Sequence, residues 1–140
     1  MDLISAYEKT NIFGNKLGMK LTVLAPGHIA YRLVITAEHF AIPQVAHGGV
    51  VAALIDGTLG VAGLSLVQSE EKVVSTVEFK VNYLKPAREG DELLAEGKVI
   101  HKGKNLLSTV CEVKNQHNEL IATGNGTFNS YPAEKVFGKQ

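Results

Sequence analysis

The chain has 140 residues, 45% of them hydrophobic, which suffices for one domain with its own core and excludes a multidomain protein. Fourteen basic and fourteen acidic residues give a formal net charge of zero, which argues against nucleic acid or an anionic membrane as a partner. The single cysteine, Cys111, cannot form an internal disulfide or supply a cysteine-based zinc site. Because the N-terminal stretch has no continuous apolar run, it does not resemble a signal peptide. We therefore expect one soluble, cytoplasmic domain without a metal site.

Two short β-prone runs, residues 20–24 and 29–36, begin the predicted fold and are joined by turn residues that indicate a hairpin. Residues 37–46 contain Pro43 and are expected to form a loop. From Gly48 to Val67 the chain is apolar, and Asp56 is the only formal charge in this run. Because a mid-membrane carboxylate is costly, we expect this run to be a helix buried nearly all round in a soluble domain.

Beyond Gln68 the hydrophobic period changes to two, which indicates strands. In the first of them Val77 and Phe79 fall on one face and Thr76 on the other. Turn residues then separate three more predicted strands, at residues 92–102, 106–114 and 120–128, and the tail from Asn129 is expected to be poorly ordered. The pattern favours an α+β domain in which an antiparallel sheet wraps around one long helix.

Four strings in this sequence carry a family likeness: HGGVVAALIDGTLGVAG at 47–63, TVEFKVNYLKPAREGD at 76–91, HKGK at 101–104 and IATGNGTF at 121–128. Together they resemble the hotdog-fold acyl-CoA thioesterases, in particular the phenylacetate-pathway or PaaI-like branch. The resemblance covers about residues 18–128, the expected core of a single domain over residues 1–140. It implies a homodimer with a continuous sheet, often paired into a homotetramer, that hydrolyses acyl-CoA to free acid and CoA. No metal or separate cofactor is implied, since CoA is part of the substrate.

Thioester hydrolysis needs a group that attacks the carbonyl or activates water, and donors that hold the oxyanion. The carboxylate of Asp56 is costly in an apolar helix unless it is paired or opens onto a water-filled site, so it is the candidate nucleophile or general base. The alternative is an Asp that only caps a neighbouring loop. The amides of Gly48 and Gly49, at the helix start, lack internal acceptors and are candidates for the oxyanion hole. The resemblance singles out Gly48.

The position of Asp56 has a consequence for assembly. It lies seven or eight residues into the predicted helix, roughly 11 Å from the glycine amides of its own chain. One carbonyl group cannot contact both, so we expect Asp56 to meet Gly48 of a second subunit, with two shared sites per dimer. Whether Asp56 attacks directly or activates water is left open by the sequence.

Three further residues enter the candidate catalytic set through the resemblance. Thr76 corresponds to a Ser or Thr that orients the attacking water in relatives, although a threonine on a solvated strand face is an equal alternative. His47 is mostly structural in the family. Several relatives carry an Asn or Gln where this chain has Ala41, so that amide is either supplied by Gln44 or absent.

A neutral protein must bind the CoA phosphates with a local cluster of cations. A turn rich in basic residues is the first candidate and a basic pair after the long strand the second; the alternative is a solvated basic turn. The residues of the first are Lys98, His101, Lys102, Gly103 and Lys104, and those of the second are Lys85 and Arg88.

The fold alone admits two other functions, acyl dehydration and acyl-CoA binding without reaction. A dehydratase needs a suitably placed His, which the His47 motif does not provide, and a binding protein lacks a nucleophile such as Asp56. The acyl group, whether aryl or fatty, carries no recognisable motif in the sequence.

Overall fold

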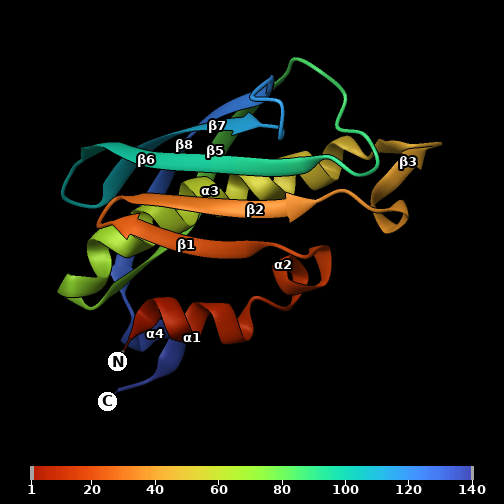
Figure 1. Cartoon of the computed structure of the whole chain (residues 1–140). Helices are drawn as coiled ribbons and strands as arrows, with labels where there is room; N and C mark the ends of the chain where they lie inside the picture. Colours follow the sequence, from red (N-terminus) through yellow and green to blue (C-terminus); the bar gives the residue numbers. More distant parts are fainter. Residues whose placement is uncertain (1, 140) are drawn as a thin grey trace.

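The computed structural model describes residues 2–139 and consists of a six-stranded antiparallel sheet curled around one long helix (Figure 1). That helix is α3 (Gly48–Val67), which begins and ends where the sequence predicts. The sheet order is β1-β2-β6-β7-β8-β5, so β1 and β5 form its edges. The strands are β1 (Lys20–Ala25), β2 (His28–Val34), β5 (Lys72–Tyr83), β6 (Glu92–Lys102), β7 (Leu106–Lys114) and β8 (Leu120–Pro132).

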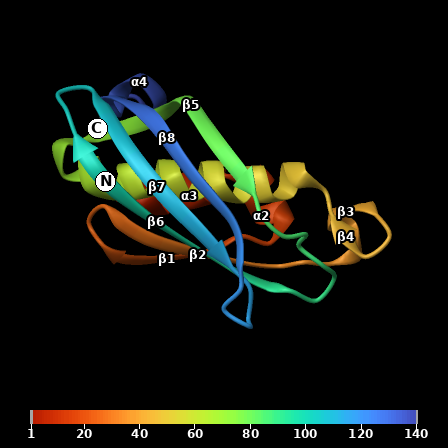
Figure 2. The same ribbon diagram turned by 90° about the horizontal axis from the view of Figure 1, so that it is seen from above.

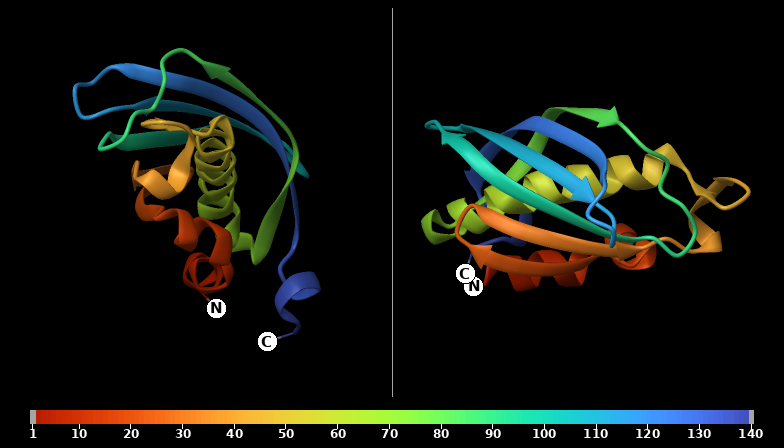
Figure 3. Two further views of the ribbon diagram at one scale, coloured as in Figure 1. Left: turned by 90° about the vertical axis from the view of Figure 1, so that its right-hand side faces the viewer. Right: turned by 45° about the horizontal axis from the view of Figure 1, so that its top comes forward.

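The concave face of the sheet holds α3, which contacts β2, β5, β6, β7 and β8 (Figures 2 and 3). Leu54, Ile55 and Leu59 are completely buried at this contact. The segment Gly48–Glu70 is long and apolar enough to span a bilayer, but 67% of its most apolar window is buried within the protein. Its hydrophobicity is therefore accounted for by the core, as the sequence predicts.

One side of α3 is only partly covered by the rest of the chain. Gly49 is exposed, and five further residues are only half-buried: Ala52, Ala53, Asp56, Gly57 and Gly60. Their spacing of three and four residues places them on one face of the helix. The predicted burial therefore holds for most of α3 and fails along this stripe, which we call the open stripe.

The sheet approaches α3 closely because two of its strands carry glycine at the contact. A Cβ atom at Gly97 of β6 would lie 2.9 Å from the carbonyl oxygen of Thr58, and one at Gly124 of β8 would overlap the side chain of Ile55. Any other residue at these positions would push the helix away from the sheet. These two glycines therefore fix the position of the helix that carries Asp56.

Both ends of the chain are structured and contribute to the core. The helices α1 (Leu3–Thr10) and α2 (Ile12–Leu17) precede β1, and Asp2 caps α1 by accepting hydrogen bonds from the amides of Ile4 and Ser5. Leu3 and Ile4 are buried in the main hydrophobic cluster. The core therefore extends beyond the predicted limits of 18–128, and the two termini lie at the same end of the molecule (Figure 1).

The prediction of a poorly ordered tail from Asn129 is wrong. Strand β8 continues to Pro132 because Tyr131 pairs with Val73 of β5, and the short helix α4 (Glu134–Phe137) follows. Ala133, between β8 and α4, is buried and donates its amide hydrogen to the carbonyl of Glu71. The polar composition of the tail predicts poor order because composition alone carries no information on the pairing with β5.

The expected loop at 37–46 contains short regular elements. A single 3-10 turn, η1 (Ala37–His39), leads into a small hairpin formed by β3 (Phe40–Ile42) and β4 (Val45–Ala46). Gln44 occupies the hairpin turn with a positive φ of 66°. This hairpin lies directly before the start of α3 and fixes the direction from which the chain enters the helix.

A bulge in β5 changes which side chains face the helix. Thr76 pairs with Phe128, but Glu78 pairs with the adjacent Thr127, so Val77 is an extra residue in the strand. Val77 is exposed, whereas Thr76 hydrogen-bonds to α3 and Phe79 packs against the core. The predicted alternation, with Thr76 and Phe79 on opposite faces, is therefore wrong.

Candidate active site

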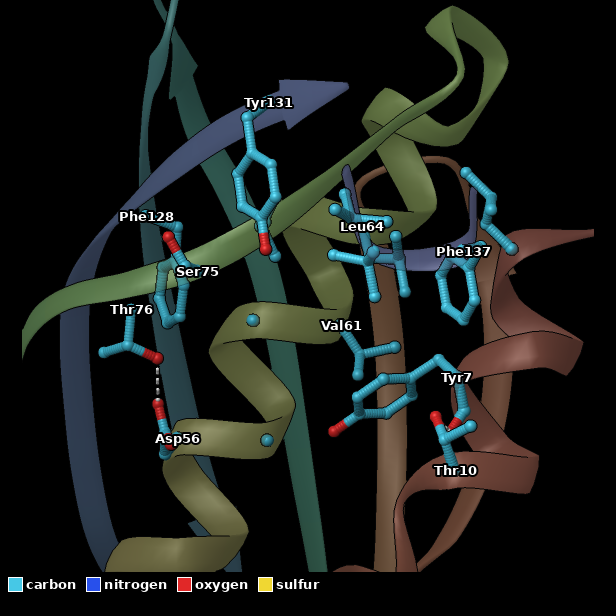
Figure 4. A pocket seen from close by; sticks show the side chains of 16 residues that line it. Tyr7, Thr10, Asp56, Val61, Leu64, Ser75, Thr76, Phe128, Tyr131 and Phe137 are labelled. Atoms are coloured by element: carbon cyan, nitrogen blue, oxygen red, sulfur yellow. Dashed lines mark hydrogen bonds between the residues drawn. The ribbon is translucent and has the colours of Figure 1, made fainter. Parts of the chain in front are cut away.

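Asp56 lies in the middle of α3 and is paired with a hydroxyl group of the sheet. Its Oδ1 atom accepts a hydrogen bond of 2.9 Å from the Thr76 hydroxyl (Figure 4). Both residues line a cavity of about 250 Å³. The carboxylate is therefore paired and also opens onto a cavity, which are the two conditions under which a charge in an apolar helix is tolerated. Its partner belongs to β5, so Asp56 does not act as a loop cap.

The cavity beside Asp56 is mainly apolar and aromatic. It is bounded by α3, by β5 and the end of β8, and by the two terminal helices α1 and α4 (Figure 4). Burial, followed by the negative charge of Asp56, raises the pKa of Tyr7 above its ordinary value of 10.0. Tyr7 therefore stays neutral at physiological pH, close to the carboxylate. This tyrosine was missed at the sequence level because the N-terminal stretch carries no motif.

The start of α3 is held by His47, its N-cap residue. The Nδ1 atom of His47 accepts a hydrogen bond of 2.7 Å from the amide of Gly49. This bond makes His47 an acceptor at Nδ1, with its ring proton on Nε2. The same bond occupies the amide hydrogen of Gly49. Among residues 2–139 no acceptor is found for the Gly48 amide, so Gly48 alone of the pair offers a free donor.

Tyr83, at the end of β5, fixes the other side of Gly48. Its hydroxyl donates a hydrogen bond of 2.8 Å to the Gly48 carbonyl. A Cβ atom added to Gly48 would lie 3.4 Å from the same hydroxyl, so the two groups are in close contact. Sequence reasoning missed this residue because no spacing rule relates a strand end to a backbone carbonyl 35 positions away.

The structure does not bring Asp56 and Gly48 together within one chain. They are eight residues apart in the same helix, which corresponds to a rise of about 12 Å. Gln44 precedes the helix and is exposed in the β3–β4 turn, where its carbonyl accepts a hydrogen bond from the amide of Glu89. Ala41 is exposed on β3. The predicted catalytic residues thus form two groups, one at the start of α3 and one at its middle.

The two predicted phosphate-binding clusters lie at opposite ends of α3. Arg88 is next to Ala87, whose carbonyl accepts from Ala46 just before the helix. Lys102 lies 3.0 Å from Glu70, just after the helix. Since α3 has 20 residues, the clusters are about 30 Å apart in one chain.

Acidic side chains lie within both clusters, although the sequence of the turn contains none. The hydrogen bond from Lys102 lowers the pKa of Glu70, and that from Lys85 lowers the pKa of Glu119, which it meets at 2.6 Å. Lys98 lies 4.0 Å from Glu96. Among the described residues, three of the predicted cations make no ion pair: Arg88, His101 and Lys104. Gly103 provides the turn between β6 and β7, where its amide bonds to Leu106.

A curled antiparallel sheet around a single long helix is a hotdog fold, and in this chain a carboxylate of that helix opens onto an apolar cavity. Comparisons with known proteins agree. The family model of the thioesterase superfamily matches residues 43–122. The chain is 30% identical to human acyl-coenzyme A thioesterase 13 over 90% of each chain. The chain belongs to the thioesterase superfamily, and it is a thioester hydrolase.

Solved structures show the same fold. The E. coli PaaI protein, from the phenylacetic acid degradation operon, superposes with a TM-score of 0.81 at 23% identity and covers 91% of this chain and 90% of its own. A Streptococcus mutans protein solved bound to acetyl CoA gives a TM-score of 0.74 at 24% identity, over 81% and 89% of the two chains. The predicted α+β hotdog fold is confirmed.

Proposed function

We propose that this protein hydrolyses acyl-CoA thioesters at two sites, each shared between the subunits of a homodimer. The observation that carries the proposal is the Asp56 carboxylate, hydrogen-bonded to Thr76 and open to an apolar cavity. The name of the human relative and the acetyl CoA bound by the structural neighbour support acyl-CoA as the substrate. The chemistry uses only side chains and backbone amides, so it requires neither a metal nor a cofactor.

Asp56 either attacks the thioester carbonyl, so that the C–S bond breaks, CoA leaves as the thiolate and water then hydrolyses the resulting anhydride, or it takes a proton from an attacking water and passes it to the departing thiolate. The hydroxyl of Thr76 holds the carboxylate in place. The negative charge that develops on the carbonyl oxygen is stabilised by the amide of Gly48, at the positive end of the α3 dipole. Tyr83 and His47 position this amide through the Gly48 carbonyl and the Gly49 amide. Gln44 remains the candidate for the side-chain amide that Ala41 does not supply.

The distance between the two groups requires a second subunit. Attack needs the nucleophile about 3.5 Å from the carbonyl carbon, which the helical rise of about 12 Å between Gly48 and Asp56 forbids within one chain. The open stripe carries Asp56 and begins beside Gly48, so antiparallel contact between two such stripes places each Asp56 near the other subunit's Gly48.

The free edge of the sheet supports the same assembly. β5 is a 12-residue edge strand with exposed Val77 and Tyr83. A long edge with exposed apolar side chains is normally covered by another strand. Pairing of β5 with its symmetry mate gives the continuous sheet of the proposed dimer. Further association into a homotetramer and a cytoplasmic location remain part of the proposal.

Coenzyme A brings phosphates that the shared site must bind at its entrance. Arg88 lies beside the start of α3, on the side of the oxyanion donor, and its side chain makes no ion pair among the described residues. His101 and Lys104, at the other end of the helix, likewise make no ion pair among the described residues. We therefore rank these three residues above the paired Lys85, Lys98 and Lys102 as phosphate ligands.

Release of free CoA from a panel of acyl-CoA thioesters tests the proposal, with the wild-type protein compared with Asp56→Ala. Alanine keeps the helix and removes only the carboxylate. We expect release by the wild-type protein to fall by at least about a thousandfold in the variant. Glu38→Ala, at an exposed acid of η1, serves as the control and should retain wild-type rates. Equal release by the wild-type protein and Asp56→Ala contradicts the proposal.

A further inference from the structure

The cavity that opens beside Asp56 bears on the acyl group, about which the sequence has no motif. We infer that it is the acyl-binding pocket, that Leu3 and Phe137 form its end wall, and that it accepts apolar acyl groups of up to about ten non-hydrogen atoms beyond the carbonyl carbon. The inference rests on the proposed function and adds the substrate class and the residues that limit it.

The pocket runs from the reacting group along α3. Asp56 and Thr76 lie at one end (Figure 4). Gly60 and Leu64, which also line the pocket, follow Asp56 at four-residue intervals and therefore lie on the same side of the helix. Gly60 has no side chain to fill the space, so the cavity continues past it. A thioester whose carbonyl carbon meets Asp56 therefore directs its acyl group along the helix toward Leu64.

The walls suit an apolar and, in particular, a flat group. The rings of Tyr7 and Tyr131 lie on opposite sides of the cavity, and the ring of Phe128 lies near Thr76 (Figure 4). Aromatic walls with a few polar groups at one end are typical of pockets for small apolar ligands. A chain of methylene groups and an arylacetyl group are both apolar, so both suit such walls.

Two side chains separate this pocket from a second hollow. Leu3 of α1 and Phe137 of α4 line both the 250 Å³ pocket and a neighbouring space of about 500 Å³. Glu70, Lys72 and Lys139 line the second space, so it is charged. An acyl chain that outgrew the pocket would have to displace the wall and then lie among charges, which is unfavourable.

The volume sets the limit. A cavity of about 150 Å³ binds a benzene molecule, which has six carbon atoms, so by proportion a pocket of about 250 Å³ has room for roughly ten non-hydrogen atoms. An octanoyl and a phenylacetyl group each have seven carbon atoms beyond the carbonyl, whereas a hexadecanoyl group has about twice that number and exceeds the limit.

The pocket also assigns the two halves of the substrate to the two subunits. Asp56 opens onto walls formed by α1, β5 and α4 of its own chain, while the oxyanion donor comes from the other chain in the proposed dimer. The acyl group therefore enters the subunit that provides Asp56. A substitution in the end wall should change acyl selectivity only when it lies in that subunit.

The test compares kcat/KM for acetyl-, octanoyl-, phenylacetyl-, dodecanoyl- and hexadecanoyl-CoA. For the wild-type protein we expect octanoyl or phenylacetyl to be preferred, with hexadecanoyl at least about tenfold lower. Phe137→Ala joins the two spaces and should raise the dodecanoyl-to-octanoyl ratio by about tenfold or more. Lys135→Ala, an exposed position of the same short helix that lines neither space, should leave this ratio unchanged.

In mixed dimers with one intact site, the dodecanoyl-to-octanoyl ratio of kcat/KM should change when Phe137→Ala is on the chain that keeps Asp56. It should not change when Phe137→Ala is on the other chain. If Phe137→Ala fails to fold, Phe137→Leu and the wild-type length profile still test the wall. Hexadecanoyl-CoA hydrolysed as fast as octanoyl-CoA by the wild-type protein, or an unchanged ratio in folded Phe137→Ala, would overturn this inference alone. Absence of CoA release from every substrate would instead contradict the proposed function.

Discussion

The hydroxyl of Thr76 lies 2.9 Å from the Oδ1 atom of Asp56, and a bulge in β5 turns it toward the helix. In a regular strand Thr76 and Phe79, three positions apart, would lie on opposite faces and could not both point inward. The bulge thus supplies the hydrogen bond without removing Phe79 from the core. The contact makes Thr76 a positioning residue for the carboxylate.

Replacing Thr76 with valine removes this hydroxyl and keeps the shape of the side chain. A hydrogen bond to a charged group contributes about 1.5–3 kcal/mol, so we expect kcat to fall by roughly ten- to a hundredfold with little change in KM. Thr76→Ser keeps the hydroxyl and should recover most of the rate. Steady-state kinetics of both variants check this, and equal rates for Val and Ser would exclude the positioning role.

The Gly48 amide can be deleted with little disturbance of the helix. Gly48 is the first residue of α3, where proline is well tolerated, and the backbone of His47 (φ −58°, ψ 136°) is compatible with a following proline. Gly48→Pro should lower kcat by about a hundred- to a thousandfold, the loss typical of one oxyanion donor. Gly48→Ala keeps the N–H group and should lose much less. A proline variant as active as the alanine variant would remove Gly48 from the mechanism.

Packing between sheet and helix predicts opposite effects for two glycines. Gly97→Ala places a Cβ atom 2.9 Å from the carbonyl oxygen of Thr58 and should lower the free energy of unfolding by about 1–3 kcal/mol. Gly63→Ala meets its neighbours at 3.6 Å or more and should raise it by about 1 kcal/mol, because alanine favours the helix. Urea unfolding of both variants measures the two changes. The same sign for both would contradict this description of the interface.

The buried Cys111 links stability to high pH. Burial, and to a smaller extent the charge of Glu112, raises the pKa of this thiol from 9.0 to about 12. A thiol with a raised folded pKa stabilises fully below the unfolded pKa, and its contribution decreases as pH rises toward the folded pKa. Between about pH 9 and 12 the wild-type protein should therefore lose stability relative to Cys111→Ala.

Unfolding of the two proteins across this pH range measures the difference, and a constant difference would contradict the buried, protonated thiol. At pH 8 we expect the native thiol to react with a thiol reagent only after unfolding.

The sequence was sufficient to predict the parts of the fold that depend on periodicity and turn residues. α3 begins at Gly48 because the apolar run begins there, and β6 and β7 end where predicted because glycine or asparagine marks each turn. Asp56 and Gly48 became candidates through the charge in the apolar run and the start of the helix, and Thr76 through the family resemblance. Their hydrogen bonds are seen only in the structure, and their roles are left to the experiments above.

What the sequence did not predict depends on contacts between distant segments. The bulge at Val77 results from the register between β5 and β8, and the hydrogen bond from Tyr83 to Gly48 joins a strand end to a backbone carbonyl. The acyl pocket includes Leu3 and Phe137, from the two ends of the chain. Neither terminus carries a motif, so only the folded arrangement relates them to Asp56.

The central claim is that Asp56 of one subunit acts with Gly48 of the other. The most direct test mixes a chain carrying Asp56→Ala with a chain carrying Gly48→Pro and measures CoA release by the purified heterodimer. Each homodimer lacks one group at both sites, but the heterodimer restores one complete site. We predict about half the wild-type rate per dimer. Activity no higher than that of the two parent homodimers, in a heterodimer shown to be folded, would contradict the shared site.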